Sequence, residues 1–198
     1  LQHEIEIVSP DSTWFQDIVS TLITKYSLPR RLADSFADIQ RTPTGDLIIP
    51  EGLPGSAAKD FVADLRANNF LTFSDIVYYA YKIINLHPFV ARALSARFAW
   101  LLVDEFQDTS ELQARLLTAI HRHGQTKFFL VGDPNQSIYA FAGARPDLMT
   151  EIVGSIGATD DISLSGNFRS SRPIIAIAER LCPRTPSMTA EGLAKAFP

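Results

Sequence analysis

The sequence predicts an α/β protein in which a mostly helical part precedes a partial parallel sheet with flanking helices. Two observations predict this fold class. Apolar residues recur at helical spacing over most of residues 11–97. Beyond residue 97, short apolar runs alternate with helical segments, an order that is typical of a parallel sheet covered by helices.

The first predicted helix covers residues 13–26, where apolar side chains repeat every three or four positions behind the capping candidates Asp11 and Ser12. Pro29 can occupy the first turn of a second helix. Prolines and glycines then break the helical pattern. We therefore predict a turn, a short strand and a loop over residues 43–56.

Helical spacing resumes over residues 58–65 and again over 76–84. The second of these helices follows Thr72-Phe73-Ser74-Asp75, which resembles a capping box with aspartate in the position that glutamate usually takes. Pro88 predicts the start of one further short helix.

Three apolar runs in the second part of the chain are predicted strands: 98–103, 127–131 and 161–164. Helices are predicted between and after these strands: 110–121, 146–153 and 171–181. Open parallel sheets bind ligands just beyond the carboxyl ends of their strands. The residues that follow each run are therefore the first candidates for a functional site.

Composition excludes several classes of protein. The chain has 198 residues, 46% of them hydrophobic and 20% charged, which excludes an intrinsically disordered protein. The single cysteine, Cys182, excludes an internal disulfide framework and a multi-cysteine zinc site. The net charge of −4 indicates no overall basic surface for nucleic acid, although a local basic strip is compatible with it.

The N-terminal residues carry acids where a secretory signal peptide has positive charge. The longest apolar run, residues 98–103, is too short to span a bilayer. We therefore predict a cytoplasmic protein with no membrane partner. The chain begins with Leu1 rather than methionine, which suggests a segment of a longer protein or the removal of a leader.

Adjacent carboxylates follow the first predicted strand, because Asp104 and Glu105 come directly after Val103. Mg²⁺ favours one or two carboxylates together with waters and substrate phosphates. One acid can therefore bind the metal while its neighbour orients or deprotonates an attacking water. The alternative interpretation is a pair of solvated acids that cap the next helix.

The other two predicted strand ends also carry polar side chains. After the second run, the amide of Gln136 can contact a terminal phosphate without adding charge. After the third run, Arg169 can bind phosphate in bidentate fashion and stabilise transition-state charge. The alternatives are an ordinary Asp-Pro-Asn turn and a surface arginine beside a helix start. All three ends are predicted to meet at one edge of the sheet.

Three stretches resemble motifs of the UvrD/Rep-type superfamily 1 DNA helicases. Leu101–Ser110 resembles the Walker B segment, Val131–Ala144 resembles motif III and Leu164–Ser171 resembles motif IV, in the same order and with similar spacing. The resemblance extends over residues 61–181. It implies a RecA-like motor that uses ATP and Mg²⁺ to move along single-stranded DNA, usually in the 3′–5′ direction, and to separate duplex strands.

The resemblance implies nucleotide chemistry at the strand ends. Asp104 would bind Mg²⁺, and Glu105 would activate the hydrolytic water. Gln136 would contact the γ-phosphate and couple the nucleotide state to DNA. Arg169 would reach the γ-phosphate as a positive clamp, and Asp133 is a further candidate for nucleotide binding.

Aromatic residues are the remaining candidates that the resemblance implies. Phe168, where the family often has tyrosine, would stack on the adenine ring. Phe141, where the family often has tryptophan, would stack on a DNA base, a contact worth about 1–3 kcal/mol per base. Tyr139 is a second candidate for DNA binding, and core packing is the alternative for both Tyr139 and Phe141.

The sequence departs from the family pattern at further points, one of which is the absence of the family's arginine-bearing motifs of the second motor domain. Ala142 replaces an arginine that is common in motif III, and no Gly-x-x-x-x-Gly-Lys-[Ser/Thr] phosphate loop occurs. The resemblance therefore implies a central fragment. Residues 1–70 would be the mostly helical part of a 1B-like insertion, 71–182 the latter part of the first motor domain (1A), and 183–198 a linker and the start of the second motor domain.

The sequence thus predicts a fragment of an ATP-dependent DNA helicase or translocase that acts in repair, recombination or defence. Its expected partners are single-stranded or duplex DNA and proteins of those processes. The isolated chain is expected to be inactive, because the phosphate loop supplies most of the donors that hold ATP. The alternative is a catalytically inactive helicase-like module that binds a partner protein or DNA.

Overall fold

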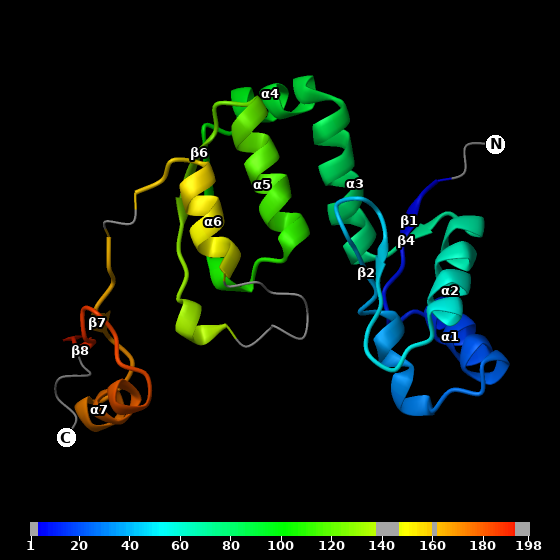
Figure 1. Ribbon diagram of the computed structural model, residues 1–198, viewed down its shortest axis with the longest axis horizontal. Coiled ribbons are helices and arrows are strands. Elements are labelled where there is room, and N and C mark those ends of the chain that lie inside the picture. The colour runs from blue at the N-terminus through cyan, green and yellow to red at the C-terminus, as the bar shows by residue number, and fades with distance from the viewer. Residues whose placement is uncertain (1–3, 138–146, 160–161, 193–198) are drawn as a thin grey trace. The chain divides into compact units, whose positions relative to one another are not determined.

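The computed structural model describes residues 4–137, 147–159 and 162–192 (Figure 1). The chain divides into two compact units, Leu1–Ile156 and Gly157–Pro198. Both combine helices with short strands, so the protein is of mixed α/β class. Three of the four strand pairs of the described residues are parallel.

The N-terminal part of the first unit is built around helices α1 (Thr13–Lys25) and α2 (Gly55–Ala67). The Ser12 hydroxyl caps α1 by accepting the Phe15 N–H at 3.3 Å, as the sequence predicts. The apolar faces of both helices are buried in one cluster, where the ring of Phe61 contacts Phe15 and Phe36 edge to face. This cluster is the largest of the three hydrophobic cores in the described residues.

Short strands and turns complete this part of the unit. β1 (Glu6–Ile7) pairs in parallel with β4 (Phe70–Leu71), and β2 (Gln40–Arg41) pairs antiparallel with β3 (Leu47–Ile48). The helix predicted after Pro29 is wrong. The chain forms two 3₁₀ turns there, η1 (Arg30–Leu32) and η2 (Asp34–Phe36). Phe36 is still buried in the core. After Phe36 the backbone must take an extended conformation, because Gln40 pairs with Ile48.

Helix α3 (Phe73–Leu86) begins with the predicted capping box, in which Thr72 and Asp75 exchange side-chain to backbone hydrogen bonds. The Asp75 carboxylate also accepts a hydrogen bond from Arg41 of β2 at 2.5 Å, and both side chains are buried. This ion pair joins the β2–β3 hairpin to α3. The predicted helix at Pro88 is confirmed as α4 (Pro88–Arg97).

The two parallel strands β5 (Trp100–Val103) and β6 (Lys127–Leu130) follow α4, with Val103 opposite Leu130. Helix α5 (Glu111–His123) connects them and contacts α3, α4 and α6 (Asp147–Ser155) (Figure 1). Val103 and Leu130 face a small core formed by Phe106, Ala114 and Ile152. Alternate residues of both strands are exposed, namely Trp100, Leu102 and Phe129.

The second unit contains β7 (Gly166–Asn167), α7 (Arg172–Leu181) and β8 (Thr189–Ala190). The strand predicted over residues 161–164 is wrong for residues 162–164, which form no strand, and Ile162 and Leu164 are exposed. An alternating apolar pattern forms a strand only where a partner strand is available. Here the pairing begins at Gly166, and the partner is β8.

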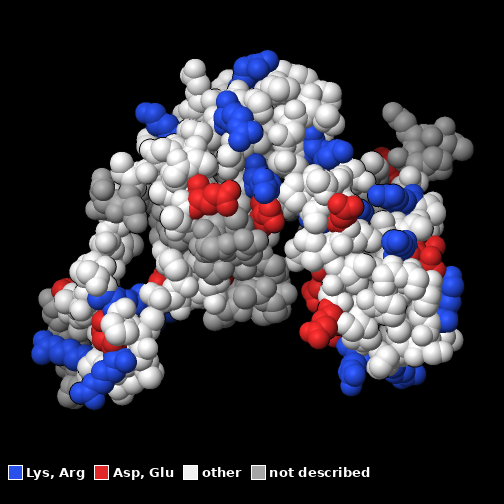
Figure 2. Space-filling model, viewed as in Figure 1, with Lys and Arg blue, Asp and Glu red and all other residues white. Residues whose placement is uncertain are grey.

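Acidic and basic side chains are both spread over the face of the first unit that Figure 2 shows, in agreement with a net charge of −4. This view gives no sign of a broad surface of a single charge. Among the described residues, no helix has the length and apolar character needed to cross a membrane.

Candidate functional site

The carboxyl ends of β5 and β6 lie together because the two strands are parallel and in register. Their pairing continues beyond the strands. The Val131 N–H donates to the Val103 carbonyl at 2.8 Å, and the Phe106 N–H donates to the Val131 carbonyl at 2.8 Å. Phe106 is buried in the small core that Val103 and Leu130 face, so it anchors the turn that follows β5.

Asp104 and Glu105 leave the end of β5 as exposed carboxylates. The backbone of Glu105 is left-handed (φ 48°, ψ 42°), and its N–H donates to Asp104 Oδ1 at 2.9 Å. A non-glycine residue in this conformation is strained, and such strain is concentrated at functional sites. Two consecutive residues at this end of the sheet therefore carry exposed carboxylates, whose oxygens are hard ligands.

Gln107 follows Glu105 by two residues, in the turn η3 (Phe106–Asp108), and is buried with 1% of its surface exposed. Its Nε2 donates to Glu105 Oε2 at 2.6 Å, and its Oε1 accepts the Asp133 N–H at 2.9 Å. Sequence reasoning assigned no role to Gln107. A glutamine between an aromatic residue and an aspartate matches no functional pattern that can be read in the sequence. Only the structure shows that this side chain is buried and makes the two contacts.

The turn after β6 presents the second set of polar groups. Asp133 precedes the short helix η4 (Pro134–Gln136) and caps it, because its Oδ1 accepts the Asn135 N–H at 3.0 Å. Asp133 Oδ2 accepts a hydrogen bond from Gln136 Nε2 at 2.7 Å. Gln136 is exposed, so its side chain is held at the strand end while remaining open to solvent.

The structure thus brings four of the predicted residues to one sheet edge: Asp104, Glu105, Asp133 and Gln136. The carboxylate oxygens fit Mg²⁺, which favours oxygen ligands. Within the part of the chain that the structure describes, no group of three or more His, Cys, Asp or Glu residues could hold a metal. A cation here would therefore need further oxygen ligands from a phosphate-bearing ligand and water.

Phe168 and Arg169 are not part of this hydrogen-bonded group. They follow β7 in the second unit, and β7 pairs with β8, so the prediction that all three strand ends share one sheet edge is wrong for the described strands. The Asn167 side chain shapes their turn by accepting the Arg169 N–H at 3.0 Å. Phe168 is 73% exposed.

Tyr139 and Phe141, the residues predicted to contact DNA, lie outside the described residues. Their assignment to DNA therefore stays a prediction.

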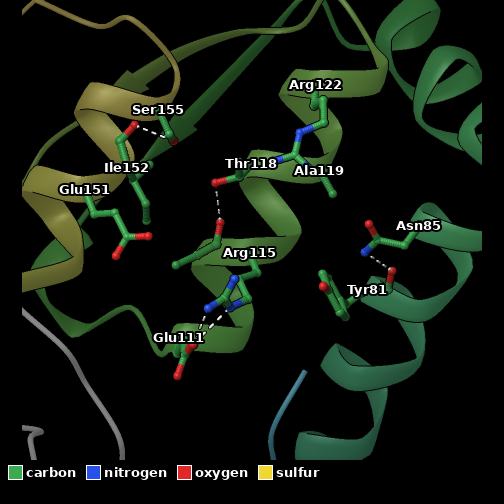
Figure 3. Close-up of a pocket in the computed structure, with 11 residues that line it drawn as sticks. Tyr81, Asn85, Glu111, Arg115, Thr118, Ala119, Arg122, Glu151, Ile152 and Ser155 are labelled. Atoms are coloured by element: carbon green, nitrogen blue, oxygen red, sulfur yellow. Dashed lines mark hydrogen bonds and ion pairs between the residues drawn. The ribbon is translucent and has the colours of Figure 1, made fainter. Parts of the chain in front are cut away.

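A cavity of about 150 Å³ lies elsewhere in the first unit, between α3, α5 and α6 (Figure 3). Tyr81 and Asn85 line it from α3, and Arg115 lines it from α5. Arg115 is bound to Glu111 of the same helix at 2.7 Å. No residue predicted for nucleotide or DNA binding lines this cavity, so the strand ends of β5 and β6 remain the candidate site.

A family model matches the central part of the chain. Residues 52–155 match the family model of the UvrD/REP helicase N-terminal domain, a range that includes β5, β6 and the turns that follow them. The match covers more than half of the chain.

Three curated proteins that are named as ATP-dependent helicase/nuclease subunits are similar to the chain. The protein of Lactobacillus johnsonii is 38% identical over 117 residues, which is 55% of this chain and 10% of that protein. The protein of Carboxydothermus hydrogenoformans is 37% identical over 144 residues, 73% of this chain and 12% of that protein. The protein of Staphylococcus haemolyticus is 34% identical over 180 residues, 84% of this chain and 14% of that protein.

The chain therefore spans between 10% and 14% of the length of these relatives. The family match covers the strands β5 and β6 and the motif-like stretches at their ends. By this match, the chain belongs to the family of the UvrD/REP helicase N-terminal domain.

Proposed function

We propose that the chain supplies the hydrolytic strand ends of an ATP-dependent DNA helicase or translocase that moves 3′–5′ along single-stranded DNA. The observation that carries this proposal is the hydrogen-bonded group at the ends of β5 and β6, which joins Glu105 to Asp133 and Gln136 through Gln107. The family match supports it, as do relatives that are named as ATP-dependent helicase/nuclease subunits. In this proposal β5 and β6 belong to a RecA-like core.

The residues at the sheet edge would divide the chemistry of hydrolysis. Asp104 would hold Mg²⁺, which neutralises phosphate charge and polarises the bond that breaks. Glu105 would accept the proton of the attacking water, because it directly follows Asp104 in the chain and its side chain is exposed to solvent. Gln136 would contact the γ-phosphate and report its presence through Asp133.

The proposal also gives nucleotide roles to two residues that follow β7. The exposed Phe168 ring would stack on adenine, and the exposed Arg169 guanidinium would stabilise charge on the γ-phosphate. Tyr139 and Phe141 would contact DNA bases. Residues 1–70 would form part of a 1B-like insertion, 71–182 part of the first motor domain and 183–198 the entry to the second.

The test is Glu105→Gln in the full-length protein that carries this chain. Removing the proton acceptor should lower DNA-stimulated ATP hydrolysis by a factor of about 10² or more, while ATP binding stays close to that of the unchanged protein. Steady-state hydrolysis and binding of a fluorescent ATP analogue measure the two quantities. Near-normal hydrolysis by this variant would show that Glu105 is not the proton acceptor.

A further inference from the structure

Gln107 makes a bridge between the two strand ends of the candidate site. It is two residues from Glu105 and 26 residues from Asp133, and its side chain binds both. It is also among the most completely buried side chains of the described residues. A buried polar side chain that satisfies partners on two separate turns restricts the motion of both.

The orientation of the Gln107 amide follows from the chemistry of its partners. The Asp133 N–H can only donate, so it must face Oε1. An ionised Glu105 can only accept, so it must face Nε2. A flipped amide would lose both hydrogen bonds, and a single orientation therefore satisfies the bridge.

Gly132 gives independent support for the importance of this bridge. A Cβ atom at position 132 would lie 2.8 Å from Gln107 Oε1 and 3.1 Å from the backbone nitrogens of Phe106 and Gln107. The missing side chain therefore leaves the space that lets the turn after β5 approach the turn after β6. This close approach places the Asp133 N–H within reach of the Gln107 amide.

We infer that Gln107 is a positioning residue that holds the Glu105 carboxylate in a fixed place relative to the turn at residues 132–137. Its contacts continue to Gln136, because Gln136 is bound to the side chain of Asp133. A displacement of this turn is therefore transmitted to Glu105. This inference rests on the proposed function, in which Glu105 accepts the proton of the attacking water.

Gln107→Glu in the full-length protein separates the two hydrogen bonds. The new carboxylate can still accept the Asp133 N–H, but it cannot donate to Glu105 and it repels it. We expect kcat for DNA-stimulated ATP hydrolysis to fall by about 10- to 100-fold, because small displacements of a reacting group are that costly. KM for ATP should change by less than about threefold, since no ATP contact is removed.

Gly132→Ala tests the same contact from the other turn and leaves Gln107 itself unchanged. It should reproduce the loss in kcat. Gln107→Met keeps the length of the side chain but removes both hydrogen bonds. The double variant Gly132→Ala with Gln107→Met should lose little more kcat than Gln107→Met alone, because the two changes break one bridge. Gly154→Ala is the matched control, since an added methyl group there meets no atom within 4 Å beyond the backbone of its own helix and its chain neighbours, and it should leave kcat unchanged.

A folded Gln107→Glu variant with the kcat of the unchanged protein would overturn the inference. If that variant does not fold, Gly132→Ala decides, and normal kcat in a folded Gly132→Ala protein would overturn it equally. Additive losses in the combined variant would also contradict a single bridge. Glu105→Gln, measured in parallel, separates the two proposals: if it abolishes hydrolysis while the Gln107 and Gly132 variants do not, only the positioning role fails.

Discussion

Glu105 combines a chemically important side chain with an unfavourable backbone. A left-handed conformation costs an L-amino acid about 1–2 kcal/mol, and glycine avoids this cost because it has no Cβ atom. The conformation is held by neighbours: the Glu105 N–H binds Asp104 Oδ1, and the following Phe106 is buried and bound to Val131. The backbone conformation of Glu105 is therefore destabilising at the residue that the proposed reaction uses.

This strain predicts the order of stability of two variants of the chain. Glu105→Gly should be more stable than Glu105→Ala by about 1 kcal/mol, because only glycine relieves the left-handed backbone. Urea unfolding followed by tryptophan fluorescence measures the difference. The control is the same pair of substitutions at Glu111, in the first turn of α5, where alanine should be the more stable residue. Equal stabilities at position 105 would show that the backbone there is not strained.

At the scale of secondary-structure elements, Asp75 serves two elements with one carboxylate. One of its oxygens accepts the Thr72 N–H at the start of α3, and the other accepts a hydrogen bond from Arg41 of β2. The Arg41 guanidinium also lies 5.4 Å from the centre of the Tyr78 ring. The start of α3 and the position of the β2–β3 hairpin are therefore coupled.

Breaking this pair should destabilise the chain strongly. Arg41→Met and Asp75→Asn each leave one buried group without its charged partner, which costs about 3–5 kcal/mol. The double variant should recover part of this loss, because it leaves no unpaired charge. Chemical denaturation measures all three. The matched control is Arg115→Met, which breaks the exposed pair with Glu111 and should change stability by less than about 0.5 kcal/mol.

A second contact between elements, at the surface, makes stability depend on pH. Lys25 Nζ and Tyr26 Oη at the end of α1 each donate to Asp60 Oδ2 of α2 at 2.7 Å. These hydrogen bonds, that of Lys25 first, lower the pKa of Asp60 below its ordinary value. The stabilisation is therefore complete above the pKa of Asp60 in the unfolded chain, and it is lost as pH falls through the lower pKa of the folded chain.

Carboxyl NMR titration of the chain should show this lowered pKa for Asp60. Lys25→Met and Tyr26→Phe should each move the pKa of Asp60 back towards its ordinary value, the first by more. The stability difference between the unchanged chain and Asp60→Asn should shrink as the solution becomes acidic. A difference that stays constant across this range would mean that the two hydrogen bonds do not favour the ionised carboxylate.

At the scale of the whole molecule, the chain corresponds to only a small part of the length of the relatives that it matches. That share is between 10% and 14%. The sequence contains no Gly-x-x-x-x-Gly-Lys-[Ser/Thr] loop, and a helicase motor needs the phosphate contacts that such a loop provides. The proposed function therefore requires that these contacts come from other parts of the same native protein.

Immunodetection with an antibody against this chain, in cells that carry the native gene, tests that requirement. The helicase proposal predicts a band several times heavier than the 21.9 kDa of the chain. A sole band near 21.9 kDa would instead favour a catalytically inactive module that binds a partner protein or DNA. The antibody's specificity is checked by loss of the band when the gene is deleted.

Local signals predicted the helices and part of the candidate site. The capping box of Thr72 and Asp75, the cap at Ser12 and the proline at the start of α4 act within one turn of the chain, so they are readable in sequence. The acids after β5 were predictable in the same way, because they directly follow an apolar run. The helix predicted after Pro29 failed because Gln40 pairs with a strand that the helical pattern does not contain.

The sequence by itself determined where the main helices begin, which runs form β5 and β6, and which residue types follow those strands. Only the tertiary structure decided that Gln107 is buried between Glu105 and Asp133, that Arg41 neutralises Asp75, and that β7 pairs with β8. The physical reason is the distance along the chain. A cap or an apolar stripe depends on neighbours within a few residues, whereas these contacts join residues about 20 to 35 positions apart, and close packing alone selects them.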